Sequence, residues 1–177
     1  MMEYTNKYWK MLMPLIKRSL TKRLGKEETA ELIKKADTVY RDMLNRIDDV
    51  GKDNPMASNI YECLVFLAVW KASDGKITVD GLREITREIM STPILKAAGL
   101  YINANKPTGI KRIGKMMTNS AKWIDEHPQY RAASWDFNFD PGKHSEGFYY
   151  HFTRCPLNTF ARREGYLEVL PAMCEID

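Results

Sequence analysis

The sequence has few cysteines and no long apolar run. Its three cysteines, an odd number, argue against a disulfide framework and favour a reducing compartment. No stretch approaches the roughly 18 uninterrupted apolar residues of a membrane-spanning helix. Lys10, Lys17 and Arg18 interrupt the apolar positions of the N-terminus, which therefore does not have the pattern of a signal peptide. We expect a cytoplasmic protein with no membrane partner.

The chain also lacks the common motifs of cofactor binding. It has no glycine-rich phosphate loop, no nucleotide fingerprint and no Cys-x-x-Cys pair, so we expect no cofactor and no bound metal. Its net charge is only +4. The local basic excess between Lys17 and Lys26 is typical of a solvated helix face, whereas a nucleic-acid site needs a denser stripe with aromatic residues between the charges. We expect no nucleic-acid partner.

What is present indicates one soluble domain over residues 1–177. Hydrophobic residues make up 44% of the chain and charged residues 28%, which is a globular composition. Apolar residues at helical spacing predict helices over residues 8–24, 26–49, 55–70 with a nearly all-apolar run at 60–70, 78–90, 91–100, 106–124, 157–164 and 168–174. Pro14 predicts a kink or a late start of the first helix, and Asn54-Pro55 predicts the N-cap of the third. The nearly all-apolar third helix is expected to be buried at the centre.

The period of the pattern changes after His127-Pro128. Phe137 and Phe139 alternate with polar residues, and after a turn at Asp140-Pro141-Gly142 the aromatic residues Tyr150 and Phe152 do the same. Such alternation predicts an antiparallel hairpin. The predicted fold class is therefore α+β: helices over residues 1–128, packed on a small antiparallel sheet, with the hairpin and short helices in residues 134–177. A hairpin alone is marginal, so we expect helices to cover its aromatic face.

Strand alternation also predicts a polar face on this hairpin. If the aromatic side chains face the helices, the following residues share the opposite face: Asp136, Asn138, Tyr149, His151, Thr153 and Cys155. Cys155 could then be a nucleophile and His151 a base oriented by Asp136, while Asn138 and Tyr149 contact a substrate. The alternative is a polar sheet face in water, which antiparallel sheets commonly have.

Three further residues could contribute to a site. Glu62 interrupts the apolar third helix, where it lies either at the solvent edge, which we favour, or buried with a raised pKa as a general-base candidate for the substrate site. Cys174 and Asp177 are three residues apart and share a helix face. With His151 and Cys155 they offer metal-ligand types, but their spacing is not diagnostic. Cys174 alone is more often a buried small hydrophobe than a ligand.

The C-terminal stretch resembles the L-2-amino-thiazoline-4-carboxylic acid hydrolase family. The resemblance is concentrated in residues 148–177 and rests on Phe152-Thr153-Arg154-Cys155-Pro156-Leu157, Ala161, Gly165-Tyr166 and Leu170-Pro171-Ala172-Met173-Cys174-Glu175-Ile176-Asp177. It implies a hydrolase that opens the C–N bond of a cyclic amidine, giving a carbamoyl cysteine. Carried over by position, Cys155, Cys174 and Asp177 are the implied site residues, with His151 beside them as a catalytic candidate.

The chain departs from the family in one place. The family has a further strand segment after the aspartate, with a glycine-rich turn, a cysteine and a phenylalanine, and this chain has none after Asp177. We expect either a truncated or divergent member, or a third strand supplied by another copy through the hairpin edge. The alternative function is a non-catalytic small-molecule-binding or sensing domain on the same scaffold.

Overall fold

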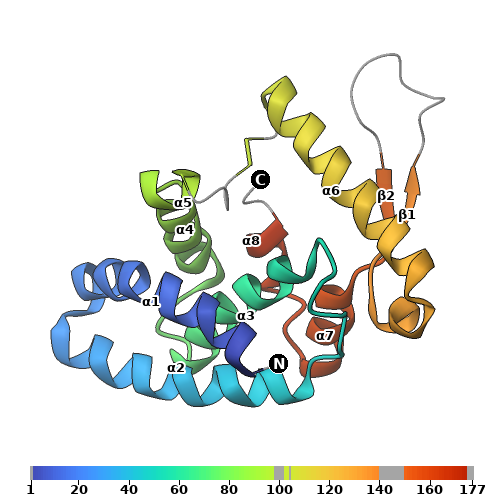
Figure 1. The fold of residues 1–177 in the computed structure, drawn as a ribbon. Coiled ribbons are helices and arrows are strands. Elements are labelled where there is room, and N and C mark those ends of the chain that lie inside the picture. Colours follow the sequence, from blue (N-terminus) through green and yellow to red (C-terminus); the bar gives the residue numbers. More distant parts are fainter. Residues whose placement is uncertain (1, 98–101, 104, 140–149, 175–177) are drawn as a thin grey trace. The chain divides into compact units, whose positions relative to one another are not determined.

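A computed structural model describes residues 2–97, 102–103, 105–139 and 150–174. Helices dominate, and the strands β1 and β2 form a two-stranded antiparallel sheet in the C-terminal part of the chain (Figure 1). The predicted α+β class is confirmed. The elements are α1 (Met2–Leu24), α2 (Lys26–Arg46), α3 (Ala57–Ala72), α4 (Val79–Met90), α5 (Pro93–Ala97), α6 (Pro107–Glu126), the 3₁₀ helix η1 (Pro128–Ala133), β1 (Asp136–Phe139), β2 (Tyr150–Arg154), α7 (Pro156–Glu164) and α8 (Leu170–Cys174).

The chain divides into two compact units. The first comprises Met1–Ile47, Asn59–Tyr101 and Glu168–Ile176, and the second contains Asp48–Ser58 and Ile102–Leu167. Along the sequence, most of the second unit therefore lies between the last segment of the first unit and the rest of the first unit.

Helix α3 is the most buried helix of the first unit. Every residue from Leu64 to Val69 is buried, as expected for a helix that is apolar all round. Helix α2 instead has one apolar stripe, with Leu32, Ala36, Tyr40 and Met43 buried. Burial raises the pKa of the Tyr40 hydroxyl, and the neighbouring Tyr61 raises it further.

Helix α4 begins as its sequence predicts. Thr78 is the N-cap, and its Oγ1 accepts a hydrogen bond of 3.1 Å from the backbone N–H of Gly81, which satisfies a donor in the first helical turn. The helix contacts α1, α5 and α8 within the first unit. Between α1 and α4, the buried Ser19 hydroxyl donates a 2.7 Å hydrogen bond to Oε2 of Glu88.

The second unit contains α6, η1, the hairpin and α7. Pro107 starts α6 and His127 ends it, both as predicted. The 3₁₀ helix η1 follows and was not predicted. The hairpin comes next, and then α7, which ends at Gly165 in the left-handed conformation, with φ of 76°.

Several predicted boundaries were wrong. Helix α1 begins at Met2 and contains Pro14, so proline does not delay its start. Helix α2 ends at Arg46, three residues before the predicted end. Helix α3 begins at Ala57 and not directly after Asn54, because the Asn54 side chain accepts a hydrogen bond from the N–H of Met56 and forms a turn before the helix.

Candidate functional site

Cys155 lies at the junction between β2 and α7. Its backbone is extended, with φ of −127° and ψ of 118°, and it is the N-cap residue of α7. Its carbonyl accepts hydrogen bonds from the N–H of Thr159 at 3.0 Å and from the Thr159 hydroxyl at 3.2 Å. Its half-buried side chain makes no capping hydrogen bond. The thiol is thus partly exposed at the N-terminus of a helix, where a small molecule can approach it.

The strand register places His151 opposite Asn138. Nδ2 of Asn138 lies 3.2 Å from Nε2 of His151. The amide nitrogen of Asn138 carries only donors, so Nε2 is the acceptor in this contact. The prediction that these two side chains share a face is confirmed, and both are exposed.

Asp136 does not lie beside His151 in the register. Its partner on β2 is Arg154, whereas the imidazole is contacted by Asn138. The expected orienting contact from Asp136 is therefore wrong. The amide of Asn138 occupies that position, since it lies directly across the ladder from the histidine.

A bulge changes the face on which Cys155 is expected. Phe137 pairs with Phe152 but Asp136 pairs with Arg154, so Thr153 is an extra residue in β2. An extra residue shifts the alternation of side chains by one, and strand parity no longer places Cys155 on the face of His151. The two residues are also up to about 13 Å apart along the chain direction, since each strand residue rises about 3.3 Å. Among the described residues, the hydrogen bond of the His151 imidazole goes to Asn138 and not to the Cys155 thiol.

The aromatic face of the hairpin is more exposed than expected. Phe139, Tyr150 and Phe152 are 39%, 38% and 41% exposed. Their rings instead pack along the sheet itself, with 5.2 Å between the centroids of Phe137 and Phe152 and 5.5 Å between those of Tyr150 and Phe152. The prediction that helices cover these side chains was wrong.

The remaining predicted site residues lie in the first unit or outside the described residues. Glu62 is 8% exposed in α3, so the favoured solvent-edge alternative was wrong and the carboxylate is buried. Cys174 is exposed at the last residue of α8, so its interpretation as a buried hydrophobe was also wrong. Tyr149 and Asp177 lie outside the described residues.

A buried polar cluster in the second unit was missed by the sequence analysis. It consists of Asn54, Ser120 and Ser134, which are at most 4% exposed. Asn54 bonds both serines, and the backbone carbonyl of Ser134 accepts a hydrogen bond of 2.9 Å from Nε of Arg154. The available signal was Ser120 among the apolar stripe of its helix, because a polar side chain on a buried stripe requires a partner.

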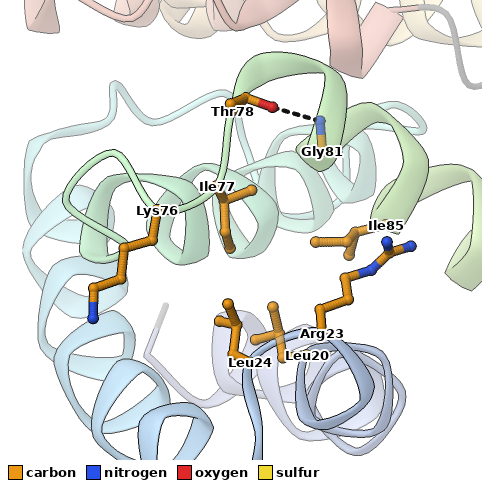
Figure 2. Close-up of a pocket in the computed structure, with 8 residues that line it drawn as sticks. All are labelled: Leu20, Arg23, Leu24, Lys76, Ile77, Thr78, Gly81 and Ile85. Atoms are coloured by element: carbon orange, nitrogen blue, oxygen red, sulfur yellow. Dashed lines mark hydrogen bonds between the residues drawn. The ribbon is translucent and has the colours of Figure 1, made fainter.

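A small pocket lies in the first unit, between the C-terminal turns of α1 and the start of α4. It has a volume of about 110 Å³ and is lined by Leu20, Arg23, Leu24, Lys76, Ile77, Thr78, Gly81 and Ile85. Figure 2 shows the apolar side chains around its centre and the Lys76 side chain extending away from it. Its polar side chains already have partners: Arg23 binds Glu84 and Glu88, Lys76 binds Glu28, and Thr78 caps α4. The volume is below the roughly 300 Å³ at which ligand pockets begin, and none of the predicted site residues lines it.

In the ranges given above, no three His, Cys, Asp or Glu side chains come together in a group that could hold a metal ion. No helix in that part of the chain is both long enough and apolar enough to cross a membrane.

Comparison with known proteins relates the chain to a protein family. A family model described as L-2-amino-thiazoline-4-carboxylic acid hydrolase matches residues 58–177. The match confirms the resemblance seen in the C-terminal residues and extends it through α3 to α6. No curated protein and no solved structure matches the chain.

Proposed function

Because the chain belongs to the L-2-amino-thiazoline-4-carboxylic acid hydrolase family, we propose that it hydrolyses the ring C–N bond of a cyclic amidine with Cys155 as nucleophile. The substrate is L-2-amino-thiazoline-4-carboxylate or a close analogue, and the product is a carbamoyl cysteine. The observation that carries the assignment of the nucleophile is the partly exposed thiol of Cys155 at the N-terminus of α7, where it makes no capping bond.

The proposed reaction has two steps. The Cys155 thiolate attacks the amidine carbon, the bond from that carbon to the ring nitrogen breaks, and the nitrogen leaves as an amine after taking a proton. Water then attacks the same carbon and the thiolate leaves, which places the carbamoyl group on the sulfur of the product. The balance is one substrate and one water to one carbamoyl cysteine, with no oxidant or metal required.

The other predicted residues have supporting roles in this proposal. His151 moves protons through a water or through the substrate, since its imidazole contacts Asn138 and the bulge in β2 removes the alternation that would place the thiol on the same face. Asn138 orients the imidazole through the 3.2 Å contact of its Nδ2 with Nε2. Asp136 and Tyr149 are proposed to contact substrate, while Glu62, Cys174 and Asp177 are kept as catalytic or binding candidates from the sequence.

The test is turnover of L-2-amino-thiazoline-4-carboxylate, followed by liquid chromatography and mass spectrometry of the carbamoyl cysteine. We expect Cys155→Ser to reduce kcat/KM by roughly a thousandfold or more, because removal of a nucleophile eliminates the covalent route. Cys63→Ser is the matched control, since Cys63 is also a half-buried cysteine that is not in a disulfide. Acid quenching should trap an adduct on wild-type Cys155.

Two results would overturn the proposal in different ways. Full activity of Cys155→Ser would remove Cys155 as nucleophile while leaving the hydrolase activity. Saturable binding of the thiazoline to the wild-type protein without any product would favour the alternative of a non-catalytic binding or sensing domain.

A further inference from the structure

The loop of residues 48–56 (the 48–56 loop) is attached to its surroundings by the side chain of Asn54. This amide makes four hydrogen bonds. Nδ2 donates to the carbonyl of Val50 at 3.2 Å and to Oγ of Ser134 at 2.9 Å. Oδ1 accepts from the N–H of Met56 at 3.0 Å and from the Ser120 hydroxyl at 2.8 Å. A side-chain amide has two N–H donors and an oxygen with two lone pairs. Asn54 therefore makes every hydrogen bond that its side chain can make.

The cluster around Asn54 extends to the residue before Cys155. Ser134, which precedes β1, accepts the Asn54 bond on its hydroxyl and the bond from Nε of Arg154 on its carbonyl, each at 2.9 Å. Arg154 is the last residue of β2 and is half-buried. The chain of contacts therefore runs from Asn54 through Ser134 to Arg154, and the next residue is Cys155.

The same loop is also connected to the helix that follows Cys155. Nη1 of Arg163 in α7 lies 3.3 Å from Oδ1 of Asp48, and the Arg163 guanidinium lies over the ring of the buried Phe160. The 48–56 loop thus contacts the chain on both sides of Cys155. The Asn54 connection is the stronger of the two, because it is buried, whereas the Arg163 ion pair is about half exposed.

We infer that Asn54 is a positioning residue for Cys155, acting through Ser134 and Arg154. The loop lies before the residues that the family model matches. An effect of Asn54 on the catalytic rate rests on the proposed function, whereas its effect on the position of the Cys155 thiol does not. The catalytic rate and the accessibility of the thiol can be measured separately. A buried, fully satisfied polar network holds its members in one arrangement, and a reacting group displaced by about 1 Å can lose about 10²-fold in rate.

The experiment measures alkylation of all three cysteines by iodoacetamide in the native protein, with peptide mass spectrometry. The variants are Asn54→Ala, Arg154→Gln and the double variant. Ser134→Ala is a milder variant, because it removes only the hydroxyl that accepts the hydrogen bond from Asn54. We expect each single variant to raise the alkylation rate of Cys155 about threefold or more relative to Cys63, because the half-buried thiol becomes more accessible. The double variant should be no faster than the faster single variant, because both changes break one chain of contacts.

Two controls separate positioning from general loss of stability. Global unfolding would raise the rates of Cys63 and Cys155 together, and hydrogen exchange in α6 reports opening of the second unit by itself. A raised ratio with retained protection in α6 therefore reports the local change. Ser19→Ala removes a buried hydroxyl bond in the first unit and should leave the ratio unchanged. If Asn54→Ala yields no folded protein by circular dichroism, Ser134→Ala and Arg154→Gln carry the same test.

An unchanged ratio in the folded variants, or single effects that multiply in the double variant, would overturn the inference. Where the wild-type protein hydrolyses the thiazoline, Asn54→Ala should also lower kcat about tenfold or more with little change in KM. Where it does not, the proposed function fails and the alkylation result still decides the role of Asn54.

Discussion

Gly51 shows how a single residue fixes the path of the 48–56 loop. Its φ is +82°, and a Cβ added there would overlap the ring of Trp123 in α6. Only glycine combines this backbone conformation with such a close approach to an aromatic ring. The N–H of Gly51 also donates a 2.9 Å hydrogen bond to Oδ1 of Asp49, which supports the same turn.

We predict that Gly51→Ala lowers the free energy of unfolding by roughly 3 kcal/mol or more, because the overlap adds to the strain of the left-handed backbone. Gly75→Ala is the matched control: its φ is +85°, but nothing lies within 4 Å of the added Cβ, so it should cost only about 1–2 kcal/mol. Urea denaturation of both variants measures the difference, and equal costs would show that the Trp123 contact is not constraining.

Residue types alone identified part of the candidate site. Cys155 at a strand end and the shared face of His151 and Asn138 could be predicted, because the first depends on a local proline and the second on alternation in a short hairpin. The partner of Asp136 could not, since it depends on a bulge in β2. Neither could the role of Asn54, because its partners Ser120 and Ser134 are 66 and 80 residues away in sequence.

Among the helices, α1 and α4 are joined by polar contacts that meet at the Glu88 carboxylate. The hydrogen bond from Ser19 is the main cause that lowers the pKa of Glu88 below its ordinary value, and Arg23 and Lys22 lower it further. Since the pKa is lowered in the folded state, the stability from this carboxylate is present above the unfolded value and is lost as the pH falls through the folded value.

We predict that Ser19→Ala lowers the free energy of unfolding by about 1 kcal/mol near neutral pH. As the pH falls, the free energy of unfolding should decrease less in this variant than in the wild type. The measurement is urea denaturation of the wild type and the variant at several pH values from neutrality to below the ordinary Glu value of 4.5. Glu84→Gln is the control, because Glu84 also pairs with Arg23 but is 68% exposed. Parallel pH curves for the wild type and Ser19→Ala would contradict the prediction.

The hairpin shows a limit of element-level prediction. Alternation correctly predicted both strands and their antiparallel pairing, because a period of two is a local property. The exposure of the aromatic side chains is not local, and it depends on what packs against the sheet. Pairing of the hairpin edge with another copy of the chain remains a prediction.

On the scale of the whole molecule, the first unit is completed by residues from the end of the sequence. Val169, Leu170, Ala172 and Met173 are buried, and α8 contacts α4. Contacts between segments so distant in sequence form late and cost chain entropy, so the first unit depends on residues that follow nearly the whole second unit.

We predict that Met173→Ala lowers the free energy of unfolding by about 2–5 kcal/mol, the usual range for truncating a buried Met. Hydrogen exchange should show lost protection in α4 while α6 and α7 retain theirs. Leu167→Ala is the matched control, since Leu167 is 40% exposed and its truncation should cost well under 1 kcal/mol. Equal loss of protection in α6 would show that the two units unfold as one.

The sequence by itself determined the α+β class, most helices, the two strands and the family, because these follow from local periodicity, capping residues and a short motif around Cys155. The tertiary structure alone decided which carboxylate is buried, which residue faces His151 and what holds the segment around Cys155. Those outcomes depend on a bulge and on hydrogen bonds between distant residues, and no local pattern encodes the partner of a side chain that lies far away along the chain.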